Sequence, residues 1–362
     1  MMIVDAHEDL AWNMLAFGRD YTLSVAQTRA REASTPIPGY VGGAMLGWPD
    51  WIQGGVGLVF ATLYATPKRY ARPWATQYYT TIDEAHRLLR NQLQLYHRLV
   101  ADHSDKFYLI TSGATLAAGL AEWSEAKPER RRLGLVLSIE GADGVRQPDE
   151  LYFWYGQGVR IVGPAWSGTQ YAGGTGEPGP FTDAGRALLE VMADLGLILD
   201  LTHLTDEGVD EALVCYPGPI IASHSNARAL LLDNGPGRHL SNHVIRRIAE
   251  GHGVIGVVLP KDFVKNGVSL TDSRQLVTVE DVVDQIDYMG QLVGHANHIG
   301  LGSDFDGGFG LEHVPTGLNS IADLSRIGEA LNRRGFSSVD VDNIMGGNWL
   351  NLLGRALPDP DV

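Results

Sequence analysis

The chain has 362 residues, of which 44% are apolar and 20% are charged, as in globular proteins with one large domain or two of medium size. Its net charge of −15 argues against nucleic acid and anionic membrane as partners. The one cysteine, Cys215, excludes an intramolecular disulfide and a cysteine-based metal site. The sequence shows neither a secretory signal pattern nor an apolar run near the ~20 residues of a membrane span, so we expect a cytoplasmic protein.

Eight short apolar runs, rich in Val, Ile and Leu, recur along the whole chain. Because these runs are continuous rather than alternating, they predict strands that are covered on both faces. In chain order they are residues 2–4, 57–64, 134–140, 159–166, 197–203, 219–225, 253–259 and 298–305. Apolar periodicity predicts helices at residues 75–103, 182–196, 242–251, 279–294, 320–335 and 340–357.

Eight strands that alternate with helices are typical of the (β/α)8 TIM barrel, a fold of the α/β class. No linker divides this pattern, so we predict a single barrel domain over residues 1–362, with helices at its C-terminal end. The Gly- and Pro-rich stretch "AGGTGEPGP" at residues 172–180 predicts a long loop after the fourth strand. We expect this loop to border the active site, because loops on a rigid scaffold often carry functional residues.

Polar side chains stand at the C-terminal ends of several predicted strands. In a TIM barrel these ends converge on one mouth, where catalytic groups collect. Carboxylates and imidazoles are costly to bury there unless a cation holds them. The side chains are His7 and Asp9 after strand one, Glu140 after strand three, His203 after strand five, His224 after strand six, and Asp304 and Asp306 after strand eight.

Imidazoles and carboxylates without thiolates suit Zn²⁺ or a similar divalent ion. The set is larger than one ion needs, which favours two ions about 3.5–4 Å apart with a bridging carboxylate. Glu140 is the natural bridge, because each of its oxygens can bind one ion. His7 and Asp9 project to the same face of a strand and can reach one ion. His203 and His224, from adjacent strands, can reach the other.

Taken singly, each histidine is better explained as a structural or surface residue, and only the joint placement at strand ends supports a metal centre. The plainer explanation is kept for the histidines outside that set. They are His86, His97, His103, His239, His243, His252, His295, His298 and His313.

The segments "DAHEDL", "SIEG", "DLTH", "SHSNAR", "GRHLS" and "GLGSDFDG", in this order, resemble the membrane (renal-type) dipeptidases, the M19 metallopeptidases of the amidohydrolase superfamily. The resemblance covers about residues 3–355, and "GSDFDG", "VPTGL" and "NIMGGNWLNLL" are its most specific part. It implies a (β/α)8 barrel with two zinc ions that hydrolyses dipeptides, and a homodimer as the assembly to expect.

Carried over by position, the resemblance supplies a role for each site residue. It makes Asp304 the catalytic aspartate that handles the proton, and Arg238 in "GRHLS" the group that binds the substrate's terminal carboxylate. The implied metal ligands are His7 and Asp9 for the first ion, Glu140 as the bridge, and His203 and His224 for the second ion.

Three positions bear on how far the resemblance reaches. Glu8 stands where the family usually has asparagine. It either adds a negative charge beside the metals or points away from them as an exposed side chain, and we favour the second. Trp166 or Ala165 stands where the family often has a histidine that steadies the substrate carbonyl, so we place Trp166 among the substrate-binding residues. Lys261, after strand seven, is either a further contact for a substrate acid group or an exposed loop lysine.

The sequence leads to the hypothesis of a dipeptide hydrolase in which a water activated by two metal ions attacks the amide carbonyl. Trp166 motivates an alternative, a hydrolase of the same barrel that acts on another amide or on a lactone, because tryptophan has one N–H donor and no acid–base chemistry. A third hypothesis is a metal-binding homologue without catalysis. All three predict a small-molecule ligand.

Overall fold

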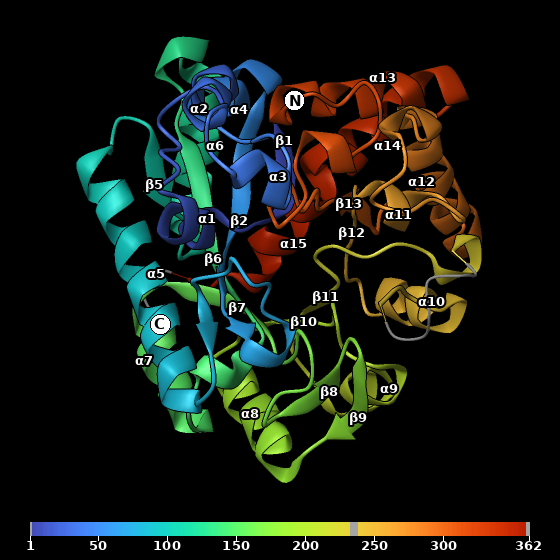
Figure 1. The fold of residues 1–362 in the computed structure, drawn as a ribbon. Helices are drawn as coiled ribbons and strands as arrows, with labels where there is room; N and C mark the ends of the chain where they lie inside the picture. The colour runs from blue at the N-terminus through green and yellow to red at the C-terminus, as the bar shows by residue number, and fades with distance from the viewer. Residues whose placement is uncertain (1, 232–237, 360–362) are drawn as a thin grey trace.

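The computed structural model describes residues 2–231 and 238–359. Eight parallel strands pair side by side in the order β11-β10-β7-β6-β2-β1-β13-β12 (Figure 1). A parallel bridge between Ala222 and Ile255 joins the two ends of this order and closes the barrel. The strands are β1 (Ile3–Glu8), β2 (Val56–Tyr64), β6 (Leu133–Glu140), β7 (Val159–Gly163), β10 (Ile198–Asp200), β11 (Ile220–Ile221), β12 (Ile255–Val257) and β13 (Ile299–Leu301). The predicted TIM barrel is thus confirmed.

Helices and short strands fill the connections between the barrel strands. The α-helices are α1 (Leu10–Phe17), α2 (Val25–Glu32), α3 (Ile37–Val41), α4 (Trp48–Gly54), α5 (Ile82–Asp102), α6 (Gly113–Glu125), α7 (Leu151–Gly156), α8 (Asp183–Asp194), α9 (Asp206–Cys215), α10 (Asn242–Glu250), α11 (Lys261–Val264), α12 (Val279–Val293), α13 (Ser325–Arg334), α14 (Ser338–Asp342) and α15 (Asn348–Ala356). The remaining strands are β3 (Thr66–Pro67), β4 (Tyr78–Tyr79), β5 (Phe107–Leu109), β8 (Ala172–Gly174) and β9 (Glu177–Phe181).

Several predicted elements differ from the structure in their bounds, and two of these differences have a clear local cause. The helix predicted from residue 75 begins at Ile82, because Thr81 and Glu84 form a capping box there and β4 precedes it. The stretch predicted as a loop at 172–180 is an antiparallel hairpin of β8 and β9, which lies against α8 and α9 (Figure 1). Its Gly173 faces the backbone of Gly179 so closely that a Cβ atom would not fit. The glycines that suggested a flexible loop therefore allow close pairing.

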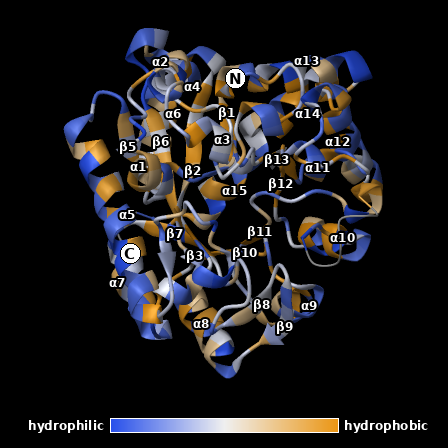
Figure 2. Ribbon diagram, in the orientation of Figure 1, coloured by the Kyte–Doolittle hydropathy of each residue, from blue (hydrophilic) through white to orange (hydrophobic). Residues whose placement is uncertain are grey.

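The barrel interior changes from apolar to polar along each strand. Along β6, alternate residues face inward, and Val136 lies in the apolar interior cluster while Glu140 reaches the mouth. The N-terminal part of the interior is closed by Trp349 of α15, a helix that contacts β1 and β13. Figure 2 shows the same arrangement, with hydrophobic strands at the centre and helices such as α5 that combine hydrophobic and hydrophilic residues. The polar groups therefore collect at the carboxyl ends of the strands.

Candidate active site

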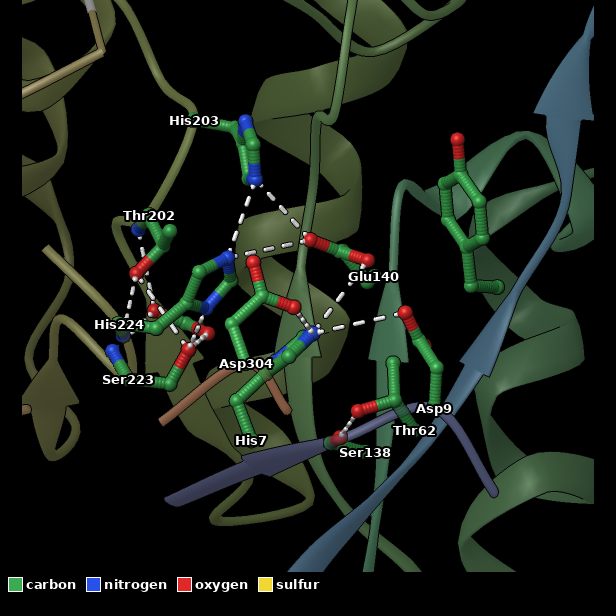
Figure 3. A network of polar contacts seen from close by, with 12 residues as sticks. His7, Asp9, Thr62, Ser138, Glu140, Thr202, His203, Ser223, His224 and Asp304 are labelled. Atoms are coloured by element: carbon green, nitrogen blue, oxygen red, sulfur yellow. Dashed lines mark hydrogen bonds and ion pairs between the residues drawn. The ribbon is translucent and has the colours of Figure 1, made fainter. Parts of the chain in front are cut away.

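Side chains from five strand ends point toward one another at the mouth of the barrel (Figure 3). The Nε2 atoms of His203 and His224 lie 3.0 and 3.4 Å from Oε1 of Glu140, and 3.2 Å from each other. The Nε2 atom of His7 lies 3.7 Å from Oε2 of the same carboxyl group. Glu140 thus stands between His7 on one side and the two other histidines on the other.

Asp9 and Asp304 also approach the Nε2 atom of His7. Their carboxyl oxygens lie 4.0 and 3.9 Å from His7 Nε2. Two groups in the described part of the chain have ligand atoms within 4.8 Å of one another, as a metal ion requires. One is His7 with Glu140 and His224, and the other is His7 with Asp9 and Asp304. The structure therefore brings together six of the seven side chains that the sequence places at the strand ends, whereas the seventh, Asp306, pairs with Arg19 instead.

A β-bulge aims the first strand at this site. The pairing of β1 with β2 slips between Asp5 and Glu8, where three steps along β1 match two along β2. Residues Val4 and Ala6 face the barrel interior, so regular alternation would have turned His7 outward. The extra residue reverses this alternation, and His7 enters the mouth while Glu8 turns toward the surrounding helices.

Hydrogen bonds behind two of the histidines fix which ring nitrogen faces the site. The hydroxyl of Ser223 donates to the Asp200 carboxylate, so its lone pair accepts from Nδ1 of His224, 2.9 Å away. The lone pair of His224 then lies on Nε2, toward Glu140. Thr175 Oγ1 lies 3.0 Å from Nδ1 of His203 and can orient that ring in the same way. Such support behind an imidazole is typical of metal ligands.

The pKa shifts of the site suit a group of metal ligands. Burial, together with the Arg238 charge, lowers the pKa of His7 to about 3, and burial also holds the pKa values of His203 and His224 well below their usual range. Burial raises the pKa of Asp9 to about 7. The pKa values of Glu140 and Asp304 are raised well above normal by burial and by nearby carboxylates. A metal ion binds neutral imidazoles and ionised carboxylates, so the raised carboxyl pKa values couple cation binding at this site to the release of protons.

An unpaired oxygen supports the same conclusion. Within residues 2–231 and 238–359, the buried Oδ1 atom of Asp9 has no hydrogen-bond partner. A buried carboxyl oxygen without a partner carries a desolvation cost that a bound cation would remove. Nitrogen and oxygen donors without sulfur fit Zn²⁺ or a similar divalent ion.

Two site residues have a backbone conformation that residues other than glycine rarely adopt. The φ angles of His203 and Asp304 are 71° and 58°, in the left-handed region. Such residues cost about 1–3 kcal/mol each and cluster at active sites. The residue before Asp304 helps to fix this backbone conformation. Ser303 donates both its backbone N–H and its hydroxyl to the Asp5 carboxylate. This pair matches the Ser223–Asp200 pair behind His224.

Arg238 lies at the edge of the same site. Its Nη1 donates to the carbonyl oxygen of His224 at 3.1 Å, and its guanidinium stacks over the ring of Phe263, 4.9 Å from the centroid. The side chain is buried, and burial lowers its pKa while the Asp304 and Glu140 carboxylates raise it. A buried cation with carboxyl groups nearby is placed to meet an anionic group of a ligand. Gly237, the first residue of the "GRHLS" motif, lies outside the described residues.

Trp166 and Ala165 have different environments. Ala165 is fully buried in the apolar core, so it cannot touch a ligand. Trp166 is half-buried, and its ring centroid lies 6.0 Å from that of His203. Of the two residues that aligned with the missing histidine, only Trp166 borders the site.

Glu8 and Lys261 are both buried, which corrects the sequence-based expectations. Glu8 points away from the cluster of histidines and carboxylates as expected, but it is buried, and its Oε1 accepts from Nε1 of Trp51 at 2.9 Å. Lys261 donates to the carbonyl oxygens of Asp272 and, at 2.9 Å, Glu312. It therefore joins two loops instead of reaching a substrate.

Sequence reasoning missed a buried polar network that joins the first and last barrel strands. The side-chain Nδ2 of Asn13 donates to the carbonyl oxygens of Asp9 at 2.9 Å and of Asp306 at 2.8 Å. Arg19 contacts Asp306 Oδ1 at 3.0 Å and pairs with Glu32 through two nitrogens. Asp306 is thus a supporting residue of the site. Asn13 lies within α1, and a single asparagine in a helix is too common for the sequence to have signalled this role.

Comparison with known proteins agrees with the site geometry. Residues 1–357 match the model of the membrane dipeptidase family, peptidase family M19. The chain belongs to peptidase family M19. As a member of this metallopeptidase family the protein is a hydrolase, and the candidate site lies where a TIM-barrel hydrolase holds its reacting groups.

Individual M19 relatives cover most of the chain. It is 29% identical over 276 residues to an uncharacterized protein from the pqqA 5′ region of Klebsiella pneumoniae, covering 74% of this chain and 95% of that protein. It is 27% identical over 361 residues to dipeptidase aclJ of Aspergillus oryzae, covering 97% and 77%. A metallopeptidase from Rhodobacter sphaeroides, liganded with a phosphinate mimic of L-Ala-D-Ala, has the same fold, with a TM-score of 0.77, 21% identity and coverage of 98% and 99%.

Although the family name mentions a membrane, no helix within the described ranges is both long and apolar enough to cross a bilayer.

Proposed function

We propose that this M19 protein is a dipeptidase that works with two divalent metal ions, with zinc as the expected metal. The observation that carries the proposal is the position of Glu140, whose two oxygens face His7 on one side and His203 and His224 on the other. In this proposal His7 and Asp9 hold the first ion, His203 and His224 hold the second, and Glu140 binds both.

The chemistry requires a nucleophile and a path for one proton. Two bound divalent ions would polarise the scissile carbonyl and lower the pKa of an attacking water toward ~7. Asp304 takes the proton from that water and passes it to the leaving amine, as general base and then general acid. Its carboxyl oxygen, 3.9 Å from His7 Nε2, places it beside the first ion's ligands.

Arg238 and Trp166 are the proposed substrate-binding residues. Arg238 pairs with the C-terminal carboxylate of the dipeptide, in a charge-assisted contact that guanidinium groups form well. Its anchorage on the carbonyl of His224 keeps it next to the second ion's ligands. Trp166 borders the other side of the site through its contact with His203.

Known relatives support dipeptides as substrates. The Aspergillus oryzae relative is named a dipeptidase, and the Rhodobacter sphaeroides metallopeptidase was liganded with a mimic of a dipeptide. A cytoplasmic location and a homodimer stay predictions.

Metal content and turnover, measured together, test the proposal. We expect the purified protein to hold about two zinc ions per chain, to hydrolyse dipeptides, and to lose both properties after chelation. Glu140→Gln removes one charge from the bridge and should reduce zinc content and turnover together. Glu211→Gln, which changes a glutamate paired with Arg186 away from the site, is the matched control and should change neither.

The panel of substrates decides between the proposal and its alternatives. It contains L-L and L-D dipeptides, N-acyl amino acids and lactones. Cleavage of N-acyl amino acids or lactones without dipeptides would replace the proposed function with that of another hydrolase. Two bound zinc ions without any turnover would point to a binding protein. A protein that binds no zinc after growth in zinc-supplemented medium would contradict the metal centre itself.

A further inference from the structure

Three aromatic side chains form a wall on one side of the proposed metal centre. Trp166 is at the middle of this wall, with its ring centroid 5.3 Å from Tyr64, 5.6 Å from Tyr70 and 6.0 Å from His203. Tyr64 is buried at the end of β2, Trp166 is half-buried after β7, and Tyr70 is 38% exposed in the connection after β2. We call Tyr64, Tyr70 and Trp166 the aromatic wall.

Neighbouring contacts hold the aromatic wall in position. Arg69, next to Tyr70, donates to both carboxyl oxygens of Glu177 at 2.6 and 2.5 Å and to the carbonyl of Gly168 at 2.7 Å. These bonds tie the connection after β2 to the β8–β9 hairpin and to the segment that follows Trp166. Because several elements fix the wall, its aromatic faces are set before a ligand arrives, which lowers the entropy cost of binding.

The order of the barrel strands places the wall opposite Arg238. Strands β2, β6 and β7 are consecutive, so Tyr64 and Trp166 stand on either side of Glu140 at the end of β6. Arg238 contacts His224 after β11 and Phe263 after β12, which lie across the ring. A dipeptide whose carboxylate pairs with Arg238 and whose amide lies over the metal ligands therefore extends its amino-terminal residue toward the wall.

We infer that the aromatic wall is the binding site for the amino-terminal side chain of the substrate, and that it selects large apolar side chains, aromatic ones above all. Aromatic rings attract one another at centroid distances of about 4.5–7 Å, and burial of apolar surface adds to this attraction. Trp166 is then the specificity-determining residue, since it contributes the largest ring and stands nearest to His203. This inference rests on the proposed dipeptidase function, which sets the direction of the substrate.

Binding of phosphinate dipeptide mimics to the zinc-loaded protein tests the inference without requiring turnover. Calorimetry should give a Kd for the Phe-Ala mimic that is at least about tenfold lower than the Kd for the Ala-Ala mimic. The reason is that stacking and burial of the phenyl ring together raise the affinity about tenfold. Trp166→Ala should reduce this ratio to about twofold or less, and Trp166→Phe should restore part of it. Tyr152→Ala, which changes an exposed tyrosine on α7, is the control and should leave the ratio unchanged.

Each result decides the question. Equal affinity for the two mimics in the unchanged protein, or a ratio that survives Trp166→Ala, would overturn the inference while dipeptide hydrolysis still supported the proposed function. Preference for a Lys-Ala mimic over a Leu-Ala mimic would also overturn it, since the wall would then bind a cation. Failure of every mimic to bind would reject the inference, and absence of dipeptide hydrolysis in the same preparation would reject the proposed function as well.

Discussion

The two ends of the barrel are built from the same strands but have opposite chemistry. At the N-terminal end, Met2, Val136 and Trp349 belong to one buried apolar cluster, and Trp349 donates from Nε1 to the carbonyl of Leu301 at 3.0 Å. At the C-terminal end, Glu140 and Asp304 are buried with raised pKa values among histidines with lowered pKa values.

This difference separates the region that stabilises the molecule from the region where we propose that the chemistry takes place. The apolar end removes surface from water and tolerates no gap, because packed interiors lose contacts wherever a cavity forms. The mouth instead keeps groups that oppose folding, including left-handed backbone at His203 and Asp304. Changes at the two ends should therefore affect different measurements.

Asp304→Asn should give the largest separation of the two ends. The amide cannot accept and return a proton, so kcat should fall about 10³-fold, within the usual range for loss of general acid–base catalysis. Zinc content and Tm should stay near those of the unchanged protein. Full activity in this variant, measured by single-turnover hydrolysis of a dipeptide, would remove Asp304 from the proposed mechanism.

Trp349→Ala should do the reverse at the apolar end. The cavity left by a fully buried ring should lower the free energy of unfolding by about 3–5 kcal/mol. Zinc per folded chain and kcat should be unchanged, as urea unfolding and activity assays of the same sample can show. Trp349→Phe should cost less, and a loss of zinc at constant stability would contradict the separation between the two ends.

Asn13→Ala tests whether the geometry of the mouth depends on hydrogen bonds from a residue outside it. Loss of the two bonds to the carbonyls of Asp9 and Asp306 frees the segments that carry Asp9 and Asp304. We expect zinc affinity or kcat/KM to fall about tenfold or somewhat more, as when other groups behind metal ligands are changed. Asn13→Asp keeps the size but loses the donor and should resemble alanine. Asn242→Ala, which removes a bond to Tyr288 away from the mouth, should leave both unchanged.

The pH dependence of the metal-free protein should show the smallest effect. Between pH 6.5 and about 7, Asp9 keeps part of its proton in the native state and releases it on unfolding, because burial raises its pKa to about 7, and the raised pKa values of Glu140 and Asp304 act in the same direction. Stability without metal should therefore fall as pH rises through this window, by up to about 1.4 kcal/mol per pH unit for each proton. Histidines with lowered pKa values act only below pH 6.5. Unfolding in chelator at several pH values tests this, and added zinc should flatten the curve.

The sequence by itself determined the order of the barrel strands along the chain and predicted which side chains meet at the mouth. Continuous apolar runs identified the strands, and the position of His7, Glu140, His203, His224 and Asp304 at strand ends predicted that they meet. This worked because parallel strands of a closed barrel have to bring their carboxyl ends to one place. The resemblance to the M19 family added roles that spacing alone does not supply.

Only the tertiary structure decided the details that depend on contacts between distant segments. The bulge in β1, the burial of Glu8 against Trp51, and the bonds from Asn13 to the last strand have no local signature. The wall of Tyr64, Tyr70 and Trp166 forms because the connection after β2 packs on the segment after β7. The sequence shows which side chains are suited to the core and which are suited to binding a ligand. The neighbour that each side chain contacts is set by packing across the whole barrel.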